Sequence, residues 1–286
     1  MTKKIPEPGT QATDPPLAEN VAVLTRPVEI WCGGQAAKAT SALDSIARET
    51  AIALIYNDIS HAVMMASPQD LEAFALGFSL TEGIVSNIED IYGITIAASQ
   101  AGTEVSLSIA SQCFVNLKNK RRNLTGRTGC GICGAESLQQ LWQPVPAVTA
   151  DFRVDHSAIA RATRNLAAHQ PLQTATGACH AAAWCDVDGT ILCACEDVGR
   201  HNALDKLIGQ LWQSQRLGQD GILLITSRAS YEIVQKSAMA SFGIVVAVSA
   251  PTSLAIEIVL EANITLVGFS RDDRHIAYTH DQRLRR

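Results

Sequence analysis

The chain has 286 residues, 47% of them hydrophobic and 18% charged, which are the proportions of a globular protein with a substantial core. The formal net charge of −5 gives no overall basis for binding nucleic acid, so any cationic surface must be local. The sequence contains no apolar run of about eighteen residues, which argues against a transmembrane helix and against a membrane partner.

The N-terminal segment contains Lys3 and Lys4, followed by Pro, Gly, Thr and Asp without an apolar stretch. This pattern differs from that of a secretory signal, and it predicts a disordered tail over residues 1–18 of a cytoplasmic protein. In a chain of this length the eight cysteines are expected to be reduced thiols rather than a disulfide framework. Cys185, Cys193 and Cys195 lie among apolar residues, where we expect them to act as small hydrophobic side chains.

Residues 19–125 are expected to form a small α+β domain. Apolar alternation predicts strands at residues 21–30, 51–56, 61–65, 91–96 and 105–109, the second and third of them joined as a hairpin. Ser67 and Pro68 have the residue types of a helix N-cap and first helical position, so a helix is predicted to begin there and to end at Gly83.

A run of basic residues after Phe114 leads into two cysteines. Lys118 to Arg122 and Arg127 precede the segment Gly129-Cys130-Gly131-Ile132-Cys133-Gly134. Such a run is commonly a solvated loop, but beside two thiols it would also lower their pKa values. Residues 135–142 are then predicted to form a helix.

Residues 126–286 are expected to form an α/β domain, with the Cys-x-x-Cys loop at its junction with the first domain. Helices and strands alternate in it, which is typical of a layered and largely parallel sheet. Helices are predicted at residues 157–169, 202–212, 231–241 and 252–262, and strands at residues 181–186, 190–196, 222–226, 244–249 and 264–269.

Three polar clusters follow strands of this predicted sheet. Ligands of open α/β sheets bind beyond the carboxyl ends of the strands, where helix N-termini and arginines favour phosphate groups. The clusters are residues 196–202, 227–230 and 270–274, and each contains an arginine. Helix caps and solvated arginines explain any one cluster, but all three together predict a phosphate-bearing ligand. Neither an ATPase phosphate loop nor a Rossmann fingerprint is present in the sequence.

The Cys130-x-x-Cys133 pair is compatible with three kinds of chemistry. A zinc site needs two further ligands, and no second Cys-x-x-Cys exists, although Cys179 and His180 could contribute. A redox pair would lie at the start of a helix. A sulfur carrier would use one thiolate to hold a sulfane sulfur as a persulfide. The spacing alone leaves all three open.

Five longer segments carry a more specific pattern. They are Gly131-Ile132-Cys133-Gly134, Thr176-Gly177-Ala178-Cys179-His180-Ala181-Ala182, the string from Glu196 to Lys206, Ser227-Arg228-Ala229-Ser230-Tyr231-Glu232 and Gly268-Phe269-Ser270-Arg271. Together they resemble the formate dehydrogenase accessory sulfurtransferase family, FdhD, and the resemblance covers nearly everything after the tail. It implies a cytidine-deaminase-like α/β fold for the C-terminal domain, beside the smaller N-terminal α+β domain, and a homodimer.

The resemblance also implies a function. A sulfurtransferase of this family accepts sulfur from a cysteine desulfurase as a cysteine persulfide. It transfers the sulfur to the molybdenum bis(molybdopterin guanine dinucleotide) cofactor of formate dehydrogenase, so the apo-enzyme is a further expected partner. No permanent cofactor and no metal ion are expected in the protein itself.

The resemblance assigns the persulfide to Cys130. Cys133 is expected to be a helper or second carrier, because a neighbouring thiol can resolve a persulfide by exchange. The resemblance associates residues 269–274 with binding of the cofactor or a guanine nucleotide, in agreement with the strand-end argument. The residues expected to bind the cofactor are Phe269, Ser270, Arg271, Asp272, Asp273, Arg274, Arg228, Asp197, Arg200 and His201. His201 is expected to be neutral, because a helix N-terminus disfavours added positive charge.

Two alternatives come from other functional classes. A zinc-dependent deaminase would need His-x-Glu and Pro-Cys-x-x-Cys, but Gly129 precedes Cys130 and the chain has no His-x-Glu. A non-catalytic chaperone would bind the cofactor and the apo-enzyme, with the cysteines purely structural.

Overall fold

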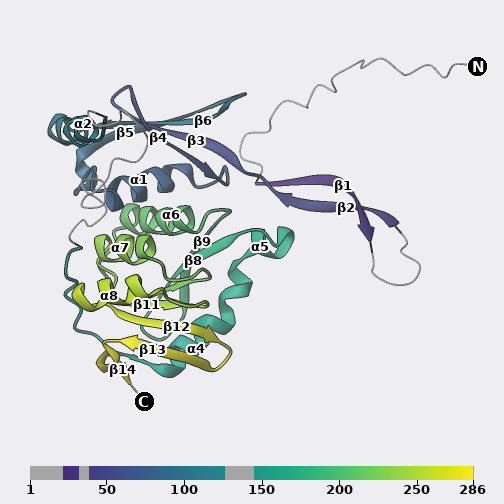
Figure 1. Cartoon of the computed structure of the whole chain (residues 1–286), viewed down its shortest axis with the longest axis vertical. Coiled ribbons are helices and arrows are strands. Elements are labelled where there is room, and N and C mark those ends of the chain that lie inside the picture. Colours follow the sequence, from purple (N-terminus) through teal and green to yellow (C-terminus); the bar gives the residue numbers. More distant parts are fainter. Residues whose placement is uncertain (1–21, 32–38, 126–144, 286) are drawn as a thin grey trace, which may run out of the picture.

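The computed structural model of the chain describes residues 22–31, 39–125 and 145–285. Its two main sheets lie on either side of a pair of packed helices, and a two-stranded arm extends from the body (Figure 1). The predicted tail at residues 1–18 and the predicted helix at residues 135–142 lie outside the described residues. No helix in the described ranges is long and apolar enough to span a membrane.

The N-terminal sheet has the strand order β4-β3-β6-β5. Its strands are β3 (Thr50–Tyr56), β4 (Ile59–Ala66), β5 (Ile91–Ser99) and β6 (Gly102–Ile109), and η1 (Ile88–Asp90) precedes β5. β3 and β4 form the predicted hairpin, and Asn57 and Asp58 take positive φ values of 43° and 66°, as a tight hairpin turn requires. These four strand predictions are confirmed.

Helix α1 (Leu71–Thr81) covers one face of this sheet, but its predicted start is wrong. The helix begins four residues after Ser67, because the Ser67 backbone is held by the second half of the chain. The Ser67 N–H donates to Asp197 Oδ2 at 2.9 Å, and the Ser67 carbonyl accepts from Lys206 Nζ at 3.0 Å. α1 is also buried around most of its circumference rather than along one face, since it lies between the sheet and α6.

Two further elements depart from the sequence predictions. The strand predicted at residues 21–30 is confirmed as β1 (Val23–Trp31), but its partner in the arm, β2 (Ala39–Ala47), was not predicted. The basic run was expected to be a loop, but residues 118–122 belong to α2 (Ser111–Thr125). Lys, Arg and Leu are good helix formers, and cations near a helix C-terminus interact favourably with its dipole.

The second half contains the remaining elements. In chain order they are β7 (Val154–Asp155), α4 (His156–Asn165), η2 (Leu166–His169), α5 (Pro171–Thr176), β8 (His180–Cys185), β9 (Ile191–Asp197), α6 (Arg200–Gln213), β10 (Ile222–Ile225), α7 (Tyr231–Met239), β11 (Ile244–Ala247), α8 (Ser253–Glu261), β12 (Thr265–Arg271), β13 (Arg274–Thr279), η3 (Asp281–Arg283) and β14 (Leu284–Arg285). The predicted alternation of helices and strands is confirmed here.

The six-stranded sheet of this half has the order β13-β12-β11-β10-β8-β9. The expectation of a largely parallel sheet is wrong, because within the described sheet only the β10–β11 and β11–β12 pairs are parallel. β8–β9 and β12–β13 are hairpins, and short connections impose antiparallel pairing. The sheet is therefore mixed.

Helices cover both faces of the mixed sheet, which confirms a layered α/β arrangement. Leu223 and Ile225 face the cluster formed with α6, α7 and α8, whereas Ile222 and Leu224 face the cluster formed with α4. This alternation follows from the two-residue period of a strand. The likeness of this layering to a cytidine deaminase stays a prediction.

Helices α1 and α6 join the two halves at close range. A Cβ on Gly77 would lie 1.8 Å from Asp205 O, and a Cβ on Gly209 would lie 1.9 Å from Ala73 O. Neither position can hold a larger residue without separating the helices. The predicted domain boundary at residues 125 and 126 stays a prediction, since residues 126–144 are not described.

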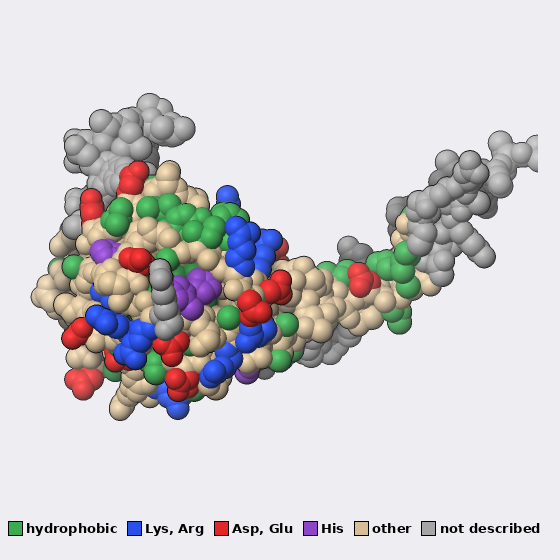
Figure 2. All heavy atoms as spheres, turned by 90° about the horizontal axis from the view of Figure 1, so that it is seen from below, with side chains coloured by type: hydrophobic (Ala, Val, Ile, Leu, Met, Phe, Trp, Pro, Cys, Tyr) green, Lys and Arg blue, Asp and Glu red, His purple; other side chains and the backbone are tan. Residues whose placement is uncertain are grey.

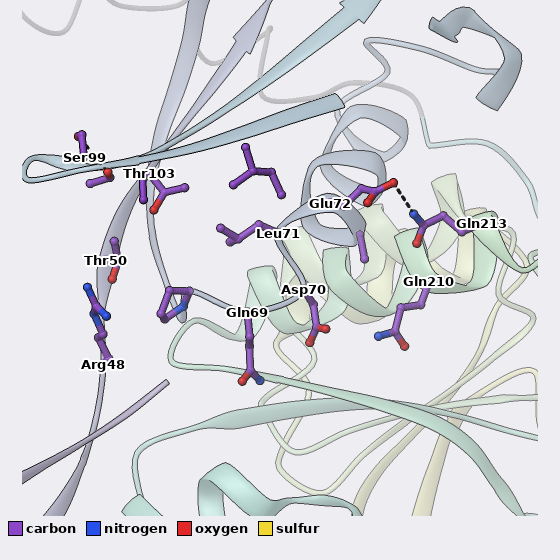
Figure 3. A pocket seen from close by; sticks show the side chains of 15 residues that line it. Arg48, Thr50, Gln69, Asp70, Leu71, Glu72, Ser99, Thr103, Gln210 and Gln213 are labelled. Carbon is purple, nitrogen blue, oxygen red and sulfur yellow. Dashed lines mark hydrogen bonds between the residues drawn. The ribbon is translucent and has the colours of Figure 1, made fainter. Parts of the chain in front are cut away.

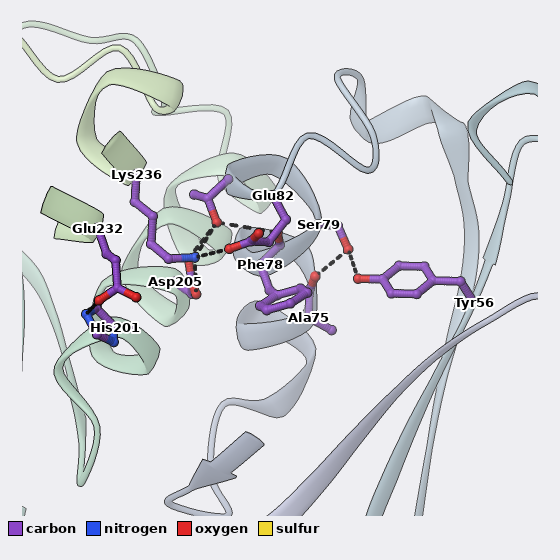
Figure 4. Close-up of polar contacts among 10 residues, drawn as sticks. Tyr56, Ala75, Phe78, Ser79, Glu82, His201, Asp205, Glu232 and Lys236 are labelled. Carbon is purple, nitrogen blue, oxygen red and sulfur yellow. Dashed lines mark hydrogen bonds and ion pairs between the residues drawn. The ribbon is translucent and has the colours of Figure 1, made fainter. Parts of the chain in front are cut away.

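Polar contacts cross the same junction. Lys236 Nζ of α7 lies 2.9 Å from Asp205 Oδ2 and 3.1 Å from Glu82 Oε1, and it donates to Thr81 Oγ1 at 2.9 Å (Figure 4). The carboxylates of Asp205 and Glu82 raise the pKa of Lys236 despite its burial. The ammonium group therefore remains protonated. It links α7 to α6 and to the C-terminal end of α1.

Candidate functional site

The three polar clusters expected to bind a ligand lie at one edge of the mixed sheet. The strand registers place the ends of β9, β10, β11 and β12 together with the starts of β8 and β13 at this edge. His180 pairs with Asp197, and Arg274 pairs with Arg271. The strand-end rule thus brings Asp197, Arg228 and Arg271 to one side of the protein, although their role toward a ligand stays a prediction.

The β12–β13 hairpin has an unusual backbone at this edge. Phe269 and Asp272 adopt left-handed φ values of 50° and 52°, and the β12–β13 register shifts between Gly268 and Arg271. The left-handed conformation costs a non-glycine residue about 1–2 kcal/mol, which other contacts of the hairpin must offset. Such strained segments often occur at binding sites. Phe269 is also a partly exposed aromatic side chain, with 38% of its surface accessible.

The arginines predicted to contact phosphate are accessible. Arg228, Arg271 and Arg274 are exposed. Arg271 Nε donates to Val248 O at 3.2 Å, which holds the guanidinium group over the end of β11. Asp272 and Asp273 are exposed on the same turn, so the hairpin tip carries both signs of charge. Acidic and basic side chains are likewise interspersed on the face shown in Figure 2.

Asp197 is completely buried. Its carboxylate lies 2.7 Å from Lys206 Nζ and accepts hydrogen bonds from Ser67 N, Gly199 N and Asn202 Nδ2 at 2.8–3.0 Å. Its side chain therefore offers no exposed atom to a ligand in this structure. It joins the end of β9 to α6 and to the segment before α1.

Arg200 and His201 begin α6 beside the start of α7. His201 Nε2 lies 2.6 Å from Glu232 Oε2 (Figure 4). Arg200 lies 3.9 Å from the same carboxylate. Burial lowers the pKa of His201 more than Glu232 raises it, in agreement with the expected neutral imidazole. The main cause is burial, whereas we expected the helix dipole.

The predicted cofactor residues do not form one compact pocket. β9 and β12 are separated by three strands, so their ends lie about 19 Å apart at ordinary interstrand spacing. Arg228, at the end of β10, is about 10 Å from the end of β12 by the same spacing. An extended dinucleotide could contact all three segments, whereas a mononucleotide could reach two.

A further cavity lies away from these residues. It has a volume of about 590 Å³ between the start of α1, the base of the arm, β5, β6 and α6 (Figure 3). Arg48, Asp70 and Gln210 line it, and Gln213 donates to Glu72 at its rim at 3.1 Å. It contains none of the predicted site residues. A shallower depression of about 460 Å³ lies at the strand-end edge, lined by Gln170, Gln173, Cys179, His180 and Thr226 among others.

The five described cysteines are free thiols with raised pKa values. Burial is the largest cause for each of them, and it raises the pKa of Cys185 to about 12. A thiol must ionise before it attacks sulfur, so these side chains are poor nucleophiles at neutral pH. The expectation that Cys185, Cys193 and Cys195 are packing residues agrees with their burial or partial burial.

Cys130 and Cys133 lie outside the described residues, as does Arg127. The last described element before them is helix α2, which ends at Thr125. Within the described ranges, no group of three or more His, Cys, Asp and Glu side chains is arranged to hold a metal ion.

Sequence reasoning missed four residues that hold the candidate site together. Lys206 pairs with Asp197 inside the protein, and α4 contributes His156, Thr163 and Arg164 to the β12–β13 hairpin. Lys206 was part of the string that carried the family resemblance. The α4 contacts left no local signal, because they join residues more than a hundred positions apart.

The His156–His275 contact predicts a pH effect. His156 Nδ1 lies 2.6 Å from His275 Nε2 with the rings stacked, so one nitrogen must donate and the other accept. Burial and the neighbouring His156 lower the pKa of His275 from 6.5. The contact is therefore complete above pH 6.5 and is lost as the pH falls through the lowered value. The melting temperature should fall more steeply below pH 6.5 in the wild type than in His275→Gln; parallel curves would contradict this.

Comparisons with known proteins agree on one family. A model described as the FdhD/NarQ family matches residues 47–285. The sulfur carrier protein FdhD of Cupriavidus necator is 52% identical over 241 residues, which are 84% of each chain. The crystal structure of a protein described as a formate dehydrogenase accessory protein from Desulfotalea psychrophila has a TM-score of 0.70 at 22% identity. It covers 92% of this chain and 100% of that one, and it shows the fold alone.

Proposed function

The chain belongs to the FdhD/NarQ family, and we propose on this basis that it carries sulfur for the maturation of formate dehydrogenase. A cysteine desulfurase supplies the sulfur as an enzyme-bound persulfide. A thiolate of the carrier attacks the terminal sulfur, and the desulfurase cysteine leaves as a thiolate. The carrier persulfide then passes its terminal sulfur, at the S(0) level, to the reduced metal centre of the cofactor destined for the apo-enzyme. That centre would supply the two electrons that make the sulfur a sulfido ligand, and the carrier cysteine leaves as a thiolate. The site of action is the cytoplasm.

Cys130 is the proposed carrier thiol, and the observation that supports it most directly is the state of the other cysteines. Every described cysteine has a raised pKa, which leaves Cys32, Cys130 and Cys133 as candidates for an ionised thiol. Cys130 follows the end of the cation-rich helix α2 by five residues, a distance of at most about 18 Å in extended chain. Nearby cations favour the thiolate.

The sulfur acceptor is proposed to be the molybdenum bis(molybdopterin guanine dinucleotide) cofactor, bound as a substrate at the strand-end edge. Arg271, Arg274 and Arg228 would bind its phosphates, because guanidinium groups form paired hydrogen bonds with phosphate oxygens. The partly exposed ring of Phe269 would lie against a base. Asp197 would support this edge from inside rather than contact the substrate.

A guanine nucleotide should therefore stabilise the protein. At a GDP concentration one hundred times the dissociation constant, binding adds about 2.7 kcal/mol to the free energy of unfolding, which raises the melting temperature by several degrees. We expect Arg271→Ala to abolish this rise and Arg216→Ala, in the loop after α6, to keep it. Calorimetric melting with and without GDP measures both. Absence of a wild-type rise at millimolar GDP would contradict the nucleotide site.

The protein is further proposed to be a homodimer, and the β1–β2 arm supports this. A two-stranded ribbon is at best marginally stable in water alone. Trp31 and Leu43 are 64% and 74% exposed on one face of the arm, and Ile30 and Ile46 are exposed on the other. A second copy of the chain would cover these side chains.

The double variant Trp31→Glu with Leu43→Glu is expected to be monomeric, because it places charges in the proposed contact. Val187→Glu alters another exposed apolar side chain, in the β8–β9 turn, and should remain dimeric. Sedimentation velocity distinguishes the two states. A double variant that stays dimeric would show that the arm is not the interface.

The loading of sulfur tests the proposed function. The wild-type protein is incubated with a cysteine desulfurase and cysteine, and its intact mass is measured. We expect the mass of one added sulfur atom, removed again by a thiol reductant. A protein that gains no sulfur yet still activates formate dehydrogenase would instead be the non-catalytic chaperone.

A further inference from the structure

The shape of the β12–β13 hairpin depends on contacts from outside it. Two left-handed residues, Phe269 and Asp272, and a shifted register give it a conformation that strand propensity does not favour. Helix α4 packs beside the hairpin (Figure 1). The residues expected to contact the cofactor therefore lie on a strained segment, and the neighbouring helix α4 holds that segment in place.

Three pairs of side chains join α4 to the hairpin. Thr163 Oγ1 lies 2.6 Å from Ser270 Oγ, and His156 Nδ1 lies 2.6 Å from His275 Nε2. Arg164 forms an ion pair with Asp273. Together the pairs contact the hairpin at the end of β12, at the turn and at the start of β13.

The three pairs differ in strength. Arg164 and Asp273 are 51% and 80% exposed, so water and salt screen their ion pair and it contributes little. Ser270 is only 1% exposed, so its hydroxyl group depends on a protein partner. The Thr163 hydroxyl donates to Ile159 O at 2.9 Å, and a hydroxyl has one proton. Ser270 is therefore the donor to Thr163, and loss of the Thr163 oxygen would leave a buried donor without its acceptor.

We propose that Thr163 of α4 is a positioning residue for the cofactor: by accepting the Ser270 hydroxyl it holds residues 269–274 in the conformation that binds the guanine nucleotide portion. This inference rests on the proposed nucleotide site. Thr163 acts through Ser270 and does not contact the ligand. Ser270, expected from sequence to bind the cofactor, instead anchors the segment from within.

The test compares variants of α4. Thr163→Val keeps the shape of the side chain and removes the oxygen, whereas Thr163→Ser keeps the oxygen. Arg161→Ala is the matched control, because Arg161 lies on the same helix but donates to Asp188 O in the β8–β9 turn at 3.0 Å. The GDP dissociation constant is measured by calorimetry. Amide hydrogen exchange of residues 266–276 is measured in the ligand-free protein.

We expect Thr163→Val to weaken GDP binding about tenfold, the effect of one buried hydrogen bond, and to speed exchange in residues 266–276 alone. Thr163→Ser should restore both, and Arg161→Ala should change neither. Unchanged GDP binding in Thr163→Val would overturn the positioning role and leave the nucleotide site standing. Faster exchange throughout the protein without rescue by Thr163→Ser would reduce Thr163 to a general structural role. A wild type that binds no GDP at millimolar concentration would overturn both the site and this inference.

Discussion

Replacement of Cys130 by alanine is expected to abolish sulfur loading and the activation of formate dehydrogenase. The variant lacks the only proposed thiolate that attacks the desulfurase persulfide, so no covalent intermediate forms. Cys133→Ala should still accept sulfur, because Cys133 is proposed to act after loading, but transfer to the acceptor should slow. Intact mass after incubation with a desulfurase and cysteine measures loading, and formate oxidation by the matured enzyme measures delivery.

Cys193→Ala is the matched control, since burial raises the pKa of this half-buried thiol. It should load and deliver sulfur like the wild type. Normal loading in Cys130→Ala would show that another cysteine carries the sulfur. Loss of loading in Cys133→Ala as well would mean that both thiols take part in the first step.

Lys206→Met is expected to lower the free energy of unfolding by about 3–5 kcal/mol, the usual cost of leaving a buried charge unpaired. Lys206 and Asp197 are both completely buried, with Nζ 2.7 Å from Oδ2. Lys206 also donates to the Ser67 carbonyl, so the variant should loosen the contact between the segment before α1 and the second half. Urea denaturation measures the loss.

The double variant Lys206→Met with Asp197→Asn separates charge from packing. The amide oxygen at position 197 can still accept the hydrogen bonds of Gly199 N and Asn202 Nδ2, which both go to Oδ1, and the side chain carries no charge. The amide NH2 in place of Oδ2 cannot accept from Ser67 N, so part of the lost stability should return. If Lys206→Met alone lowers the free energy of unfolding by less than about 1 kcal/mol, the buried ion pair does not stabilise the protein as proposed.

The strands and their order along the chain follow from local patterns. Asn57 and Asp58 tolerate the left-handed turn of the β3–β4 hairpin, and the apolar segments of β10, β11 and β12 are short, continuous and separated by helices. Local patterns do not predict whether neighbouring strands pair in parallel or antiparallel. Whether β8 lies antiparallel to β10 depends on packing across the whole sheet, which local patterns do not record.

The errors at Ser67 and in α2 have different origins. Ser67 has the residue type of a helix cap, but Asp197 and Lys206 compete for its backbone from 130 and 139 positions away, and they prevail. The basic residues before Cys130 suggested a solvated loop, although their intrinsic preference is helical. Tertiary contacts decided the first case, and propensity decided the second.

As with the fold, only part of the candidate site could be predicted from the sequence. The strand-end rule brought Arg228 and Arg271 to one edge from sequence alone. It could not reveal that Asp197 and Ser270 are buried, because their partners Lys206 and Thr163 come from helices that only the folded chain brings close. Exposure, rather than position along the chain, separates residues able to contact a ligand from those that support them.

The transfer of labelled sulfur tests the central claim most directly. The wild-type protein is loaded with radiolabelled sulfur, separated from the desulfurase, and mixed with the free molybdenum cofactor and apo-formate dehydrogenase. We expect the label to leave the carrier and to accompany the cofactor of formate dehydrogenase as formate oxidation appears, one sulfur for each carrier persulfide consumed. Activation of formate dehydrogenase while the label remains on the carrier would contradict the account.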